Sequence, residues 1–187
     1  GKQPCRGVSP CLQRDLRSSE SWPPSPTMAR LSSALIQLFE SSKMNDQEKN
    51  AAIIDELTKA YWMELETVVN YLANSVNLDG VRAEEIKKSL AADITEELAH
   101  ATQIANRIKT IDGRIPGSEH FQAVQSSLQP PQDSTDVVSV IKGVIDAENA
   151  AIGQYEKIIR LCDGYDFVSQ DMCITLLADE QQHRDRK

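Results

Sequence analysis

"EELAH" at residues 96–100 and "DEQQH" at residues 179–183 repeat one pattern, in which a pair of acidic residues is followed, after two other residues, by a histidine. Residues three apart on a helix lie on the same face, so each stretch can present a carboxylate and an imidazole together. The two pairs are Glu97 with His100 and Glu180 with His183. The chain has three histidines in all, so the use of two of them in the same pattern indicates a shared role.

The residues around these motifs are typical of long helices. Residues 46–187 are rich in Ala, Leu, Ile, Glu and Gln, a composition that favours helix over strand. The turn-forming stretches "NLDG" at 77–80 and "CDGYD" at 162–166 interrupt them. The sequence therefore predicts four helices, at about 46–76, 81–111, 134–161 and 167–187. We expect Asp79 to cap the second helix.

A long connection separates the second and third helices. "DGRIPG" at 112–117 ends one helix, and the Pro-containing stretch that follows has no helical periodicity before residue 134. About twenty extended residues span roughly 70 Å, and a thirty-residue helix is about 45 Å long, so this segment can run the length of a bundle. We predict an all-α fold: a four-helix bundle of two hairpins joined by a long crossover.

The N-terminal part differs from the rest in charge. We divide the chain into a tail at 1–45, expected to be mostly disordered with a short helix at 30–41, and a bundle at 46–187. Residues 1–30 carry five basic and two acidic side chains, so the remainder of a chain of net charge −8 carries about −11. An acidic bundle repels nucleic acid and anionic membranes, and five basic residues without interleaved aromatics do not predict DNA binding by the tail.

The cysteines and apolar runs indicate the cellular location. The four cysteines have neither CxxC nor zinc-ligand spacing, which favours a reduced, intracellular chain. The first residues lack an apolar signal core, and no apolar run is long enough to span a membrane. We therefore expect a cytoplasmic protein without a membrane partner.

Each predicted helix carries one acid on its apolar face. These acids are Glu64, Glu97, Glu148 and Glu180. In a hairpin, two residues are level when their midpoint falls at the turn, and the midpoints of the two pairs are 80.5 and 164. All four acids are therefore expected at mid-bundle. Glu66 lies on the opposite face of the first helix, where we expect it to be solvated.

The two halves also repeat in sequence. Glu64 and Tyr71 recur 84 residues later as Glu148 and Tyr155, and the Glu-x-x-His pair recurs 83 residues later. We expect each tyrosine hydroxyl to find an acid one or two turns away. The acids that precede the pairs, Glu96 and Asp179, are alternative partners of the histidine four residues on.

Four buried carboxylates require neutralisation, because burying a single unpaired charge costs several kcal/mol. Two divalent cations balance four negative charges, and two neutral imidazoles complete the ligand set. Carboxylate and imidazole together favour iron, manganese or zinc over calcium or magnesium. The sequence thus predicts a two-metal site with six ligands: Glu64, Glu97, His100, Glu148, Glu180 and His183.

These motifs resemble those of the ferritin-like superfamily, especially bacterioferritin and Dps-like di-iron carboxylate proteins. The matching stretches are "ELETVVNY" (64–71), "ELAH" (97–100), "ENAAIGQY" (148–155) and "EQQH" (180–183). The resemblance implies that Glu64 and Glu148 are terminal ligands, Glu97 and Glu180 bridge two irons, and the histidines are nitrogen ligands. Leu98 stands where bacterioferritin has its haem-ligating methionine, so we expect no haem.

The resemblance implies an Fe(II)-oxidising protein, a ferroxidase that uses O2 or H2O2 for iron storage or detoxification. Its subunits are expected to form a homo-oligomeric cage. Two alternatives stay open from the sequence. One is a di-iron or di-manganese oxidase, peroxidase or catalase without iron storage, and the other is a non-enzymatic, Dps-like DNA-protecting protein that uses the basic tail.

Overall fold

The computed structural model of the protein describes the backbone of residues 26–186 and the side chains of residues 46–186. Within that range it contains no strand. The helices are α1 (Pro26–Asn77), α2 (Ala83–Thr110), η1 (Ser118–His120), η2 (Ser126–Leu128), α3 (Val137–Cys162) and α4 (Phe167–Asp185). Contacts divide the chain into two compact units, residues 1–42 and 43–187, and the second contains the bundle.

The first helix begins earlier than the sequence pattern suggested. α1 starts at Pro26, so the short helix expected at 30–41 forms part of it. Residues 27–52 contain neither glycine nor a further proline, and nothing in them interrupts a helix. Residues 1–25 of the tail, which was expected to be mostly disordered, lie outside the described residues.

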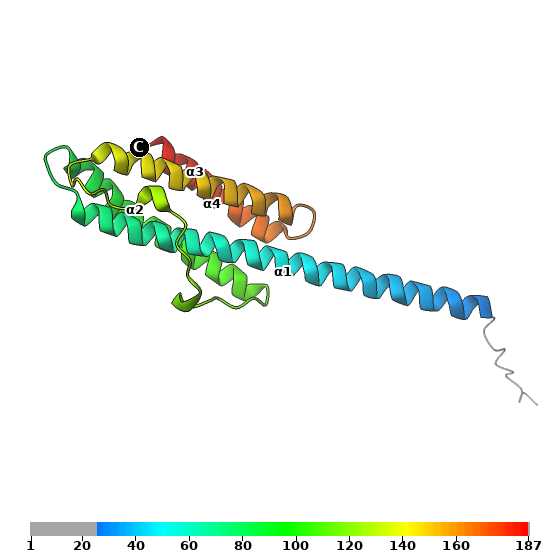
Figure 1. Cartoon of the computed structure of the whole chain (residues 1–187). Coiled ribbons are helices and arrows are strands. Elements are labelled where there is room, and N and C mark those ends of the chain that lie inside the picture. The colour runs from blue at the N-terminus through cyan, green and yellow to red at the C-terminus, as the bar shows by residue number, and fades with distance from the viewer. Residues whose placement is uncertain (1–25, 187) are drawn as a thin grey trace, which may run out of the picture. The chain divides into compact units, whose positions relative to one another are not determined.

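The bundle consists of two helical hairpins and a crossover, as predicted, and the all-α prediction is confirmed (Figure 1). Gly80 turns the first hairpin with φ 94° and Gly164 turns the second with φ 66°, conformations that other residues adopt only with strain. Asp136 caps α3 and Asp166 caps α4, since each side chain accepts the N–H of the serine three residues later.

The expected cap at Asp79 is wrong. α2 begins only at Ala83, and its N-cap, Arg82, makes no side-chain cap bond. Two turn residues follow Gly80 and separate Asp79 from the helix, so its carboxylate is not at the capping position. The backbone N–H of Asp79 instead donates to the carbonyl of Ser134, which ties the first hairpin turn to the end of the crossover.

The crossover packs closely on α1 and α3. The Glu66 carboxylate accepts the backbone N–H groups of Val124 and Gln125 at 2.8–2.9 Å. Glu66 is only 3% exposed, so the expectation that it is solvated is wrong. The crossover covers that face of α1 and supplies the donors that a buried carboxylate needs. Gly143 of α3 allows the close approach, because a β-carbon there would lie 2.3 Å from the Ser127 carbonyl oxygen.

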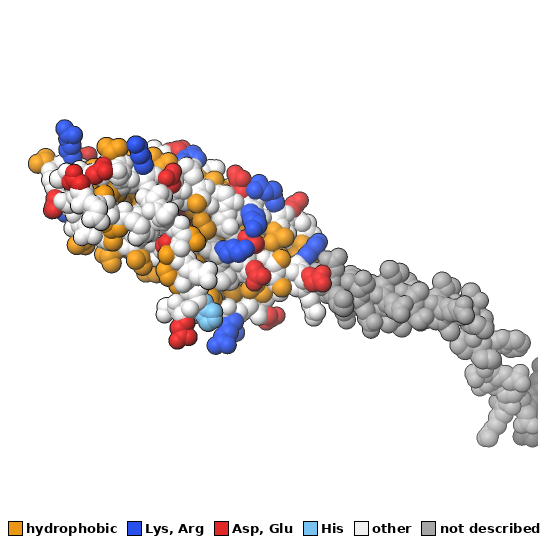
Figure 2. Space-filling view, viewed as in Figure 1, with side chains coloured by type: hydrophobic (Ala, Val, Ile, Leu, Met, Phe, Trp, Pro, Cys, Tyr) orange, Lys and Arg blue, Asp and Glu red, His pale blue; other side chains and the backbone are white. Residues whose placement is uncertain are grey.

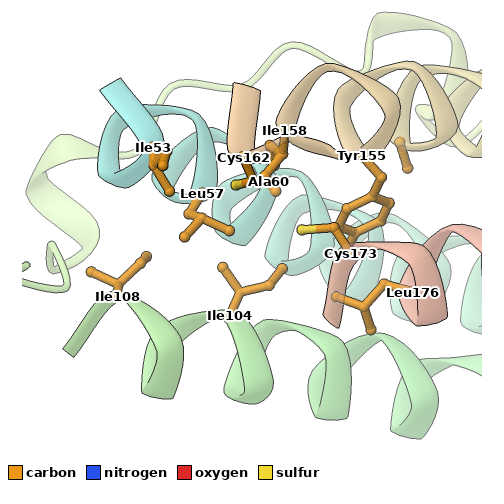
Figure 3. Packing of buried hydrophobic residues seen from close by; sticks show 11 residues of the cluster. Ile53, Leu57, Ala60, Ile104, Ile108, Tyr155, Ile158, Cys162, Cys173 and Leu176 are labelled. Atoms are coloured by element: carbon orange, nitrogen blue, oxygen red, sulfur yellow. The ribbon is translucent and has the colours of Figure 1, made fainter. Parts of the chain in front are cut away.

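Two apolar clusters fill the bundle. One gathers around Tyr155 and is shown in Figure 3, and the other gathers around Tyr71. Glu64 of α1, Glu97 of α2 and Glu148 of α3 each fall between members of the first cluster and members of the second on the same helix. A charged layer therefore lies between two apolar ones, each of which shields it from water.

The surface of the bundle is mixed. On the face seen in Figure 2, acidic and basic side chains alternate with apolar ones. No helix in the described part of the chain has both the length and the apolar character needed to cross a membrane.

Candidate metal centre

The four inward acids and the two motif histidines converge in the layer between the apolar clusters. Each is buried, with 7% or less of its surface exposed: Glu64, Glu97, His100, Glu148, Glu180 and His183. Their ligand atoms form two groups, and within each group all atoms lie within 4.8 Å of one another. The first group contains Glu64, Glu97, His100 and Glu180, and the second contains Glu97, Glu148, Glu180 and His183.

Glu97 and Glu180 belong to both groups. Each of the other four residues belongs to one, so that Glu64 stands with His100 and Glu148 stands with His183. Two ions held by these groups would share a pair of carboxylates, and each would keep one carboxylate and one imidazole of its own. The structure thus brings together all six residues predicted from the sequence.

The Nδ1 atom of each histidine lies closest to the shared acid of the opposite half. Nδ1 of His100 is 2.9 Å from Glu180 and 3.6 Å from Glu97. Nδ1 of His183 is 3.1 Å from Glu97 and 3.5 Å from Glu180. The two rings are stacked, with centroids 5.9 Å apart and planes inclined by 17°. Both imidazoles therefore direct the same nitrogen into the carboxylate cluster.

The two buried tyrosines also make contacts between the two halves of the chain. The Tyr71 hydroxyl donates to Glu148, and the Tyr155 hydroxyl donates to Glu64. The expected partner, an acid one or two turns away on the same helix, is therefore wrong. Facing helices bring each hydroxyl to the unshared acid of the opposite half, a contact that spacing along one helix cannot reveal.

Glu96 and Asp179, the acids that precede the shared glutamates, do not pair with their own histidines. Glu96 lies 2.6 Å from Nε2 of His183, and Asp179 lies 3.6 Å from Nε2 of His100. The sequence offered the histidine four residues on only as an alternative partner of each acid, and the structure does not contain those contacts. Sequence analysis missed Arg186 altogether, whose guanidinium is 3.5 Å from Glu96.

The surroundings of the two unshared acids favour their protonated forms. Burial, followed by the hydrogen bond and the charge of Glu180, raises the pKa of Glu148 to about 10. Burial and the charges of Glu180 and Glu97 raise the pKa of Glu64 well above its usual value. A second negative charge in a dry interior is unfavourable, so burial and the neighbouring carboxylates favour the neutral form of both carboxyls.

The shared acids and the histidines carry opposite charges. Burial opposes charge on both imidazoles, but hydrogen bonds to Glu180 and Glu97 outweigh it and raise the pKa of His100 to about 10 and that of His183 to about 11. Burial likewise opposes charge on Glu180, yet its hydrogen bonds with the two histidines lower its pKa to about 2. The same bonds lower the pKa of Glu97.

Protons therefore balance the cluster, with two imidazolium ions opposite two carboxylates and two neutral carboxyls. Two divalent cations would balance it equally, because four carboxylates and two neutral imidazoles carry four negative charges. Burial alone does not require a metal, since buried acids can take up protons instead. The donor set does fit one: oxygen and imidazole nitrogen ligands suit iron, manganese and zinc.

The fold and this donor set define a four-helix bundle with a buried carboxylate and histidine cluster. A family model described as "Ferritin-like domain" matches residues 54–186. The chain belongs to the ferritin-like domain family.

Known relatives agree with this assignment. Bacterioferritin of Desulfovibrio desulfuricans is 25% identical over 140 residues, which are 74% of each chain. The DNA protection during starvation protein of Pyrococcus furiosus is 25% identical over 134 residues, which are 70% of this chain and 72% of the relative.

Solved structures show the same fold. The bacterioferritin-related protein of Bacteroides fragilis, described as a dodecameric thioferritin, superimposes with a TM-score of 0.66 at 23% identity over 78% of this chain and 89% of its own. The D. desulfuricans bacterioferritin structure, described as showing a diiron site in different catalytic states, has a TM-score of 0.64 at 23% identity, over 75% of this chain and 78% of its own.

Proposed function

We propose that this protein binds two iron ions at the buried cluster and oxidises Fe(II) for iron storage or detoxification. The observation that carries the proposal is the membership of Glu97 and Glu180 in two adjacent ligand groups. A structural ion pair needs one partner for each charge, whereas paired metal ions need shared carboxylates between them. The relatedness to bacterioferritins adds support.

Each residue of the cluster has a role in this proposal. Glu97 and Glu180 would contribute to both ion sites, Glu64 and Glu148 would each hold one ion, and His100 and His183 would supply one nitrogen each. The hydroxyls of Tyr71 and Tyr155 donate hydrogen bonds to the unshared carboxyl groups and orient them. The apolar clusters on either side exclude water, which strengthens every charge interaction within the layer.

Fe(II) is the substrate of the proposed reaction. Two Fe(II) ions give up one electron each, and the pair reduces O2 to H2O2, or H2O2 to water, with uptake of two protons. Two irons at adjacent sites allow both electrons to reach one oxidant molecule in a single encounter. The four carboxylates balance the charge of two Fe(II) ions, so oxidation to Fe(III) leaves two positive charges in excess and favours departure of the product from the site.

The proposal extends to assembly and location. We expect a homo-oligomeric cage in the cytoplasm, in keeping with the dodecamer described for the B. fragilis protein. We also expect no haem, since Leu98 is a half-exposed residue without a ligating sulfur. Manganese or zinc could occupy the same donors, because both accept carboxylate and imidazole ligands.

The test begins with metal-free protein in solution. Fe(II) is added under air, with and without H2O2, while Fe(III) formation is followed by its near-ultraviolet absorbance and O2 uptake by an electrode. We expect catalysed oxidation with a fixed ratio of iron to oxidant, and its loss in Glu97→Gln, which keeps the side-chain shape but removes a shared charge. Glu156→Ala removes an exposed acid paired only with Arg160 on α3 and serves as the control.

Iron retention separates storage from the alternatives. After oxidation, elemental analysis of the protein and its mass in solution give the irons held per subunit and the size of the assembly. Many irons per subunit in a large assembly support storage. Two irons per subunit with continued turnover would instead indicate an oxidase or peroxidase, and unchanged oxidation in Glu97→Gln would reject the proposed site.

A further inference from the structure

Each histidine of the cluster has a further acid near Nε2, the ring nitrogen that does not face the shared glutamates. Both rings direct Nδ1 towards the shared glutamates, which leaves Nε2 facing away from them. Nε2 of His183 faces Glu96 on α2, and Nε2 of His100 faces Asp179 on α4. Each acid therefore reaches across the bundle to the histidine of the other half, and neither belongs to the six proposed ligands.

These two outer contacts are unequal. The Glu96 carboxylate is 2.6 Å from Nε2 of His183, which is a short, charge-assisted hydrogen bond. The Asp179 carboxylate is 3.6 Å from Nε2 of His100, which is beyond hydrogen-bond distance. Both acids are about half exposed, with relative side-chain exposures of 53% and 47%, so burial does not explain the difference.

An acceptor at Nε2 determines which nitrogen can bind a metal. Neutral imidazole carries one N–H and one lone pair, and a carboxylate at Nε2 holds the proton on that nitrogen. The lone pair is then on Nδ1, which faces the glutamates, and the ring is fixed in orientation. Such outer carboxylates make a histidine a stronger ligand, and their loss costs about 10-fold to 100-fold in metal affinity.

We propose that Glu96 is a positioning residue that fixes His183 as a ligand and thereby makes the Glu148/His183 side the tighter of two unequal metal sites. This inference rests on the proposed metal function. Asp179 stands in the corresponding place for His100 but holds it more loosely. The two halves of the chain thus have matching proposed ligands, but they differ in the acid that contacts the outer nitrogen of each histidine.

Arg186 strengthens the asymmetry. Its guanidinium lies 3.5 Å from Oε2 of Glu96, the same oxygen that faces Nε2 of His183, and 3.7 Å from Asp93, and so helps to fix the Glu96 carboxylate. Asp93, Glu96 and His183 also form a group that could hold a cation. The positive charge of Arg186 already lies beside both acids, which favours a supporting role for Glu96 over a third metal site.

Co(II) titration of the metal-free full chain tests the inference. Co(II) bound by carboxylate and imidazole has a visible spectrum, so the two binding steps can be followed without turnover. We expect wild type to bind two ions with unequal constants. Glu96→Ala should weaken the tighter step about 10-fold or more. Glu96→Gln, which keeps an oxygen acceptor at the same place, should recover part of that loss.

A double-mutant comparison shows whether Glu96 acts through His183. In a His183→Ala background the further change Glu96→Ala should have little effect, because the residue that it positions is gone. Asp179→Ala should change either constant less than Glu96→Ala does. Glu156→Ala, an exposed, ion-paired acid away from the histidines, controls for the loss of one negative charge. Thermal unfolding of each metal-free variant checks that it is folded.

A second readout reports the histidine directly. In zinc-loaded protein labelled with 15N at histidine, NMR should show His183 with its proton on Nε2, and Glu96→Ala should remove or broaden that signal. If wild type binds two Co(II) ions and Glu96→Ala leaves both binding constants unchanged, this inference is overturned and the proposed function stands. The same holds if Glu96→Ala weakens Co(II) binding as much in the His183→Ala background as it does in wild type. Wild type that binds no Co(II) would overturn the proposed function, and this inference with it.

Discussion

The Tyr155 hydroxyl on α3 donates a hydrogen bond to the Glu64 carboxyl on α1. The corresponding residues of the other half make the same contact, from Tyr71 to Glu148. Each hydroxyl occupies one oxygen of an unshared acid and leaves the other directed at the cluster. The tyrosines thus orient the two residues that would bind one ion each.

Replacing these hydroxyls should affect the two sites separately. Tyr155→Phe keeps the buried ring and removes the bond to Glu64, so we expect binding at the Glu64/His100 side to weaken by about 10-fold. Tyr71→Phe should weaken the Glu148/His183 side instead. Co(II) titration measures the two binding constants in each variant. If both variants weaken the same binding constant, the assignment of one tyrosine to each metal site is wrong.

Metal affinity should rise steeply with pH. The pKa values of His100, His183 and Glu148 are raised to about 10, 11 and 10, and the pKa of Glu64 is also raised, so the metal-free cluster favours protons on all four groups. A metal must displace those protons, and lowering the pH makes the displacement harder. We expect the release of up to four protons for two Co(II) ions.

Proton release can be measured by calorimetry in two buffers of different ionisation enthalpy. His183→Ala should release fewer protons than wild type, since one of the displaced protons belongs to that imidazole. Affinity that is flat between pH 6 and pH 8 would contradict the displacement of protons by the metal.

The start of α4 is held by an ion pair that the start of α3 lacks. Asp166 caps α4 and also binds Arg107 of α2 at 2.6 Å, in a largely buried contact. Asp166→Ala removes the cap and leaves the Arg107 guanidinium without its charged partner, so we expect a loss of roughly 2–3 kcal/mol in the free energy of unfolding. Asp136→Ala removes only the exposed cap of α3, and its loss should be smaller. Urea denaturation of metal-free protein compares them, and equal losses would mean that Arg107 contributes nothing.

Two glycines of α3 should respond in opposite ways to alanine. At Gly143 a β-carbon would meet backbone atoms of Ser127 and Leu128 at 2.3–2.9 Å, so we expect destabilisation by roughly 1–3 kcal/mol and a loosened crossover. At Gly153 a β-carbon would have no atom within 4 Å other than those of its own helix backbone and chain neighbours. Alanine there should stabilise the helix by roughly 0.5–1 kcal/mol. Thermal unfolding and hydrogen exchange in the crossover distinguish the two. A neutral Gly143→Ala would show that the crossover moves aside easily.

The sequence was sufficient to predict the cluster because hairpin geometry is simple. Two positions equally far from a turn are level, and this rule placed Glu64 beside Glu97 and Glu148 beside Glu180. Helical periodicity then indicated that these acids face inward. Both rules use local spacing, and both held in the structure.

Contacts between distant segments could not be predicted in the same way. Periodicity identified the polar face that carries Glu66, but it could not show that the crossover would cover that face. The partners of Glu96 and of the tyrosines lie 77 to 91 residues away, on the other half. The duplicated acid in "EELAH" and "DEQQH" was a signal of the outer contacts, and it did not specify which histidine each acid would reach.

The crossed contacts make the hairpins mutually dependent. The residues of one hairpin that would bind metal are aligned mainly by side chains of the other, so neither half is a smaller working version of the whole. A chain cut within the crossover should regain its metal capacity only when both fragments are recombined. If the fold arose by duplication of a hairpin, the two copies would have had to change together. A substitution at an outer acid of one copy alters the surroundings of the histidine in the other copy.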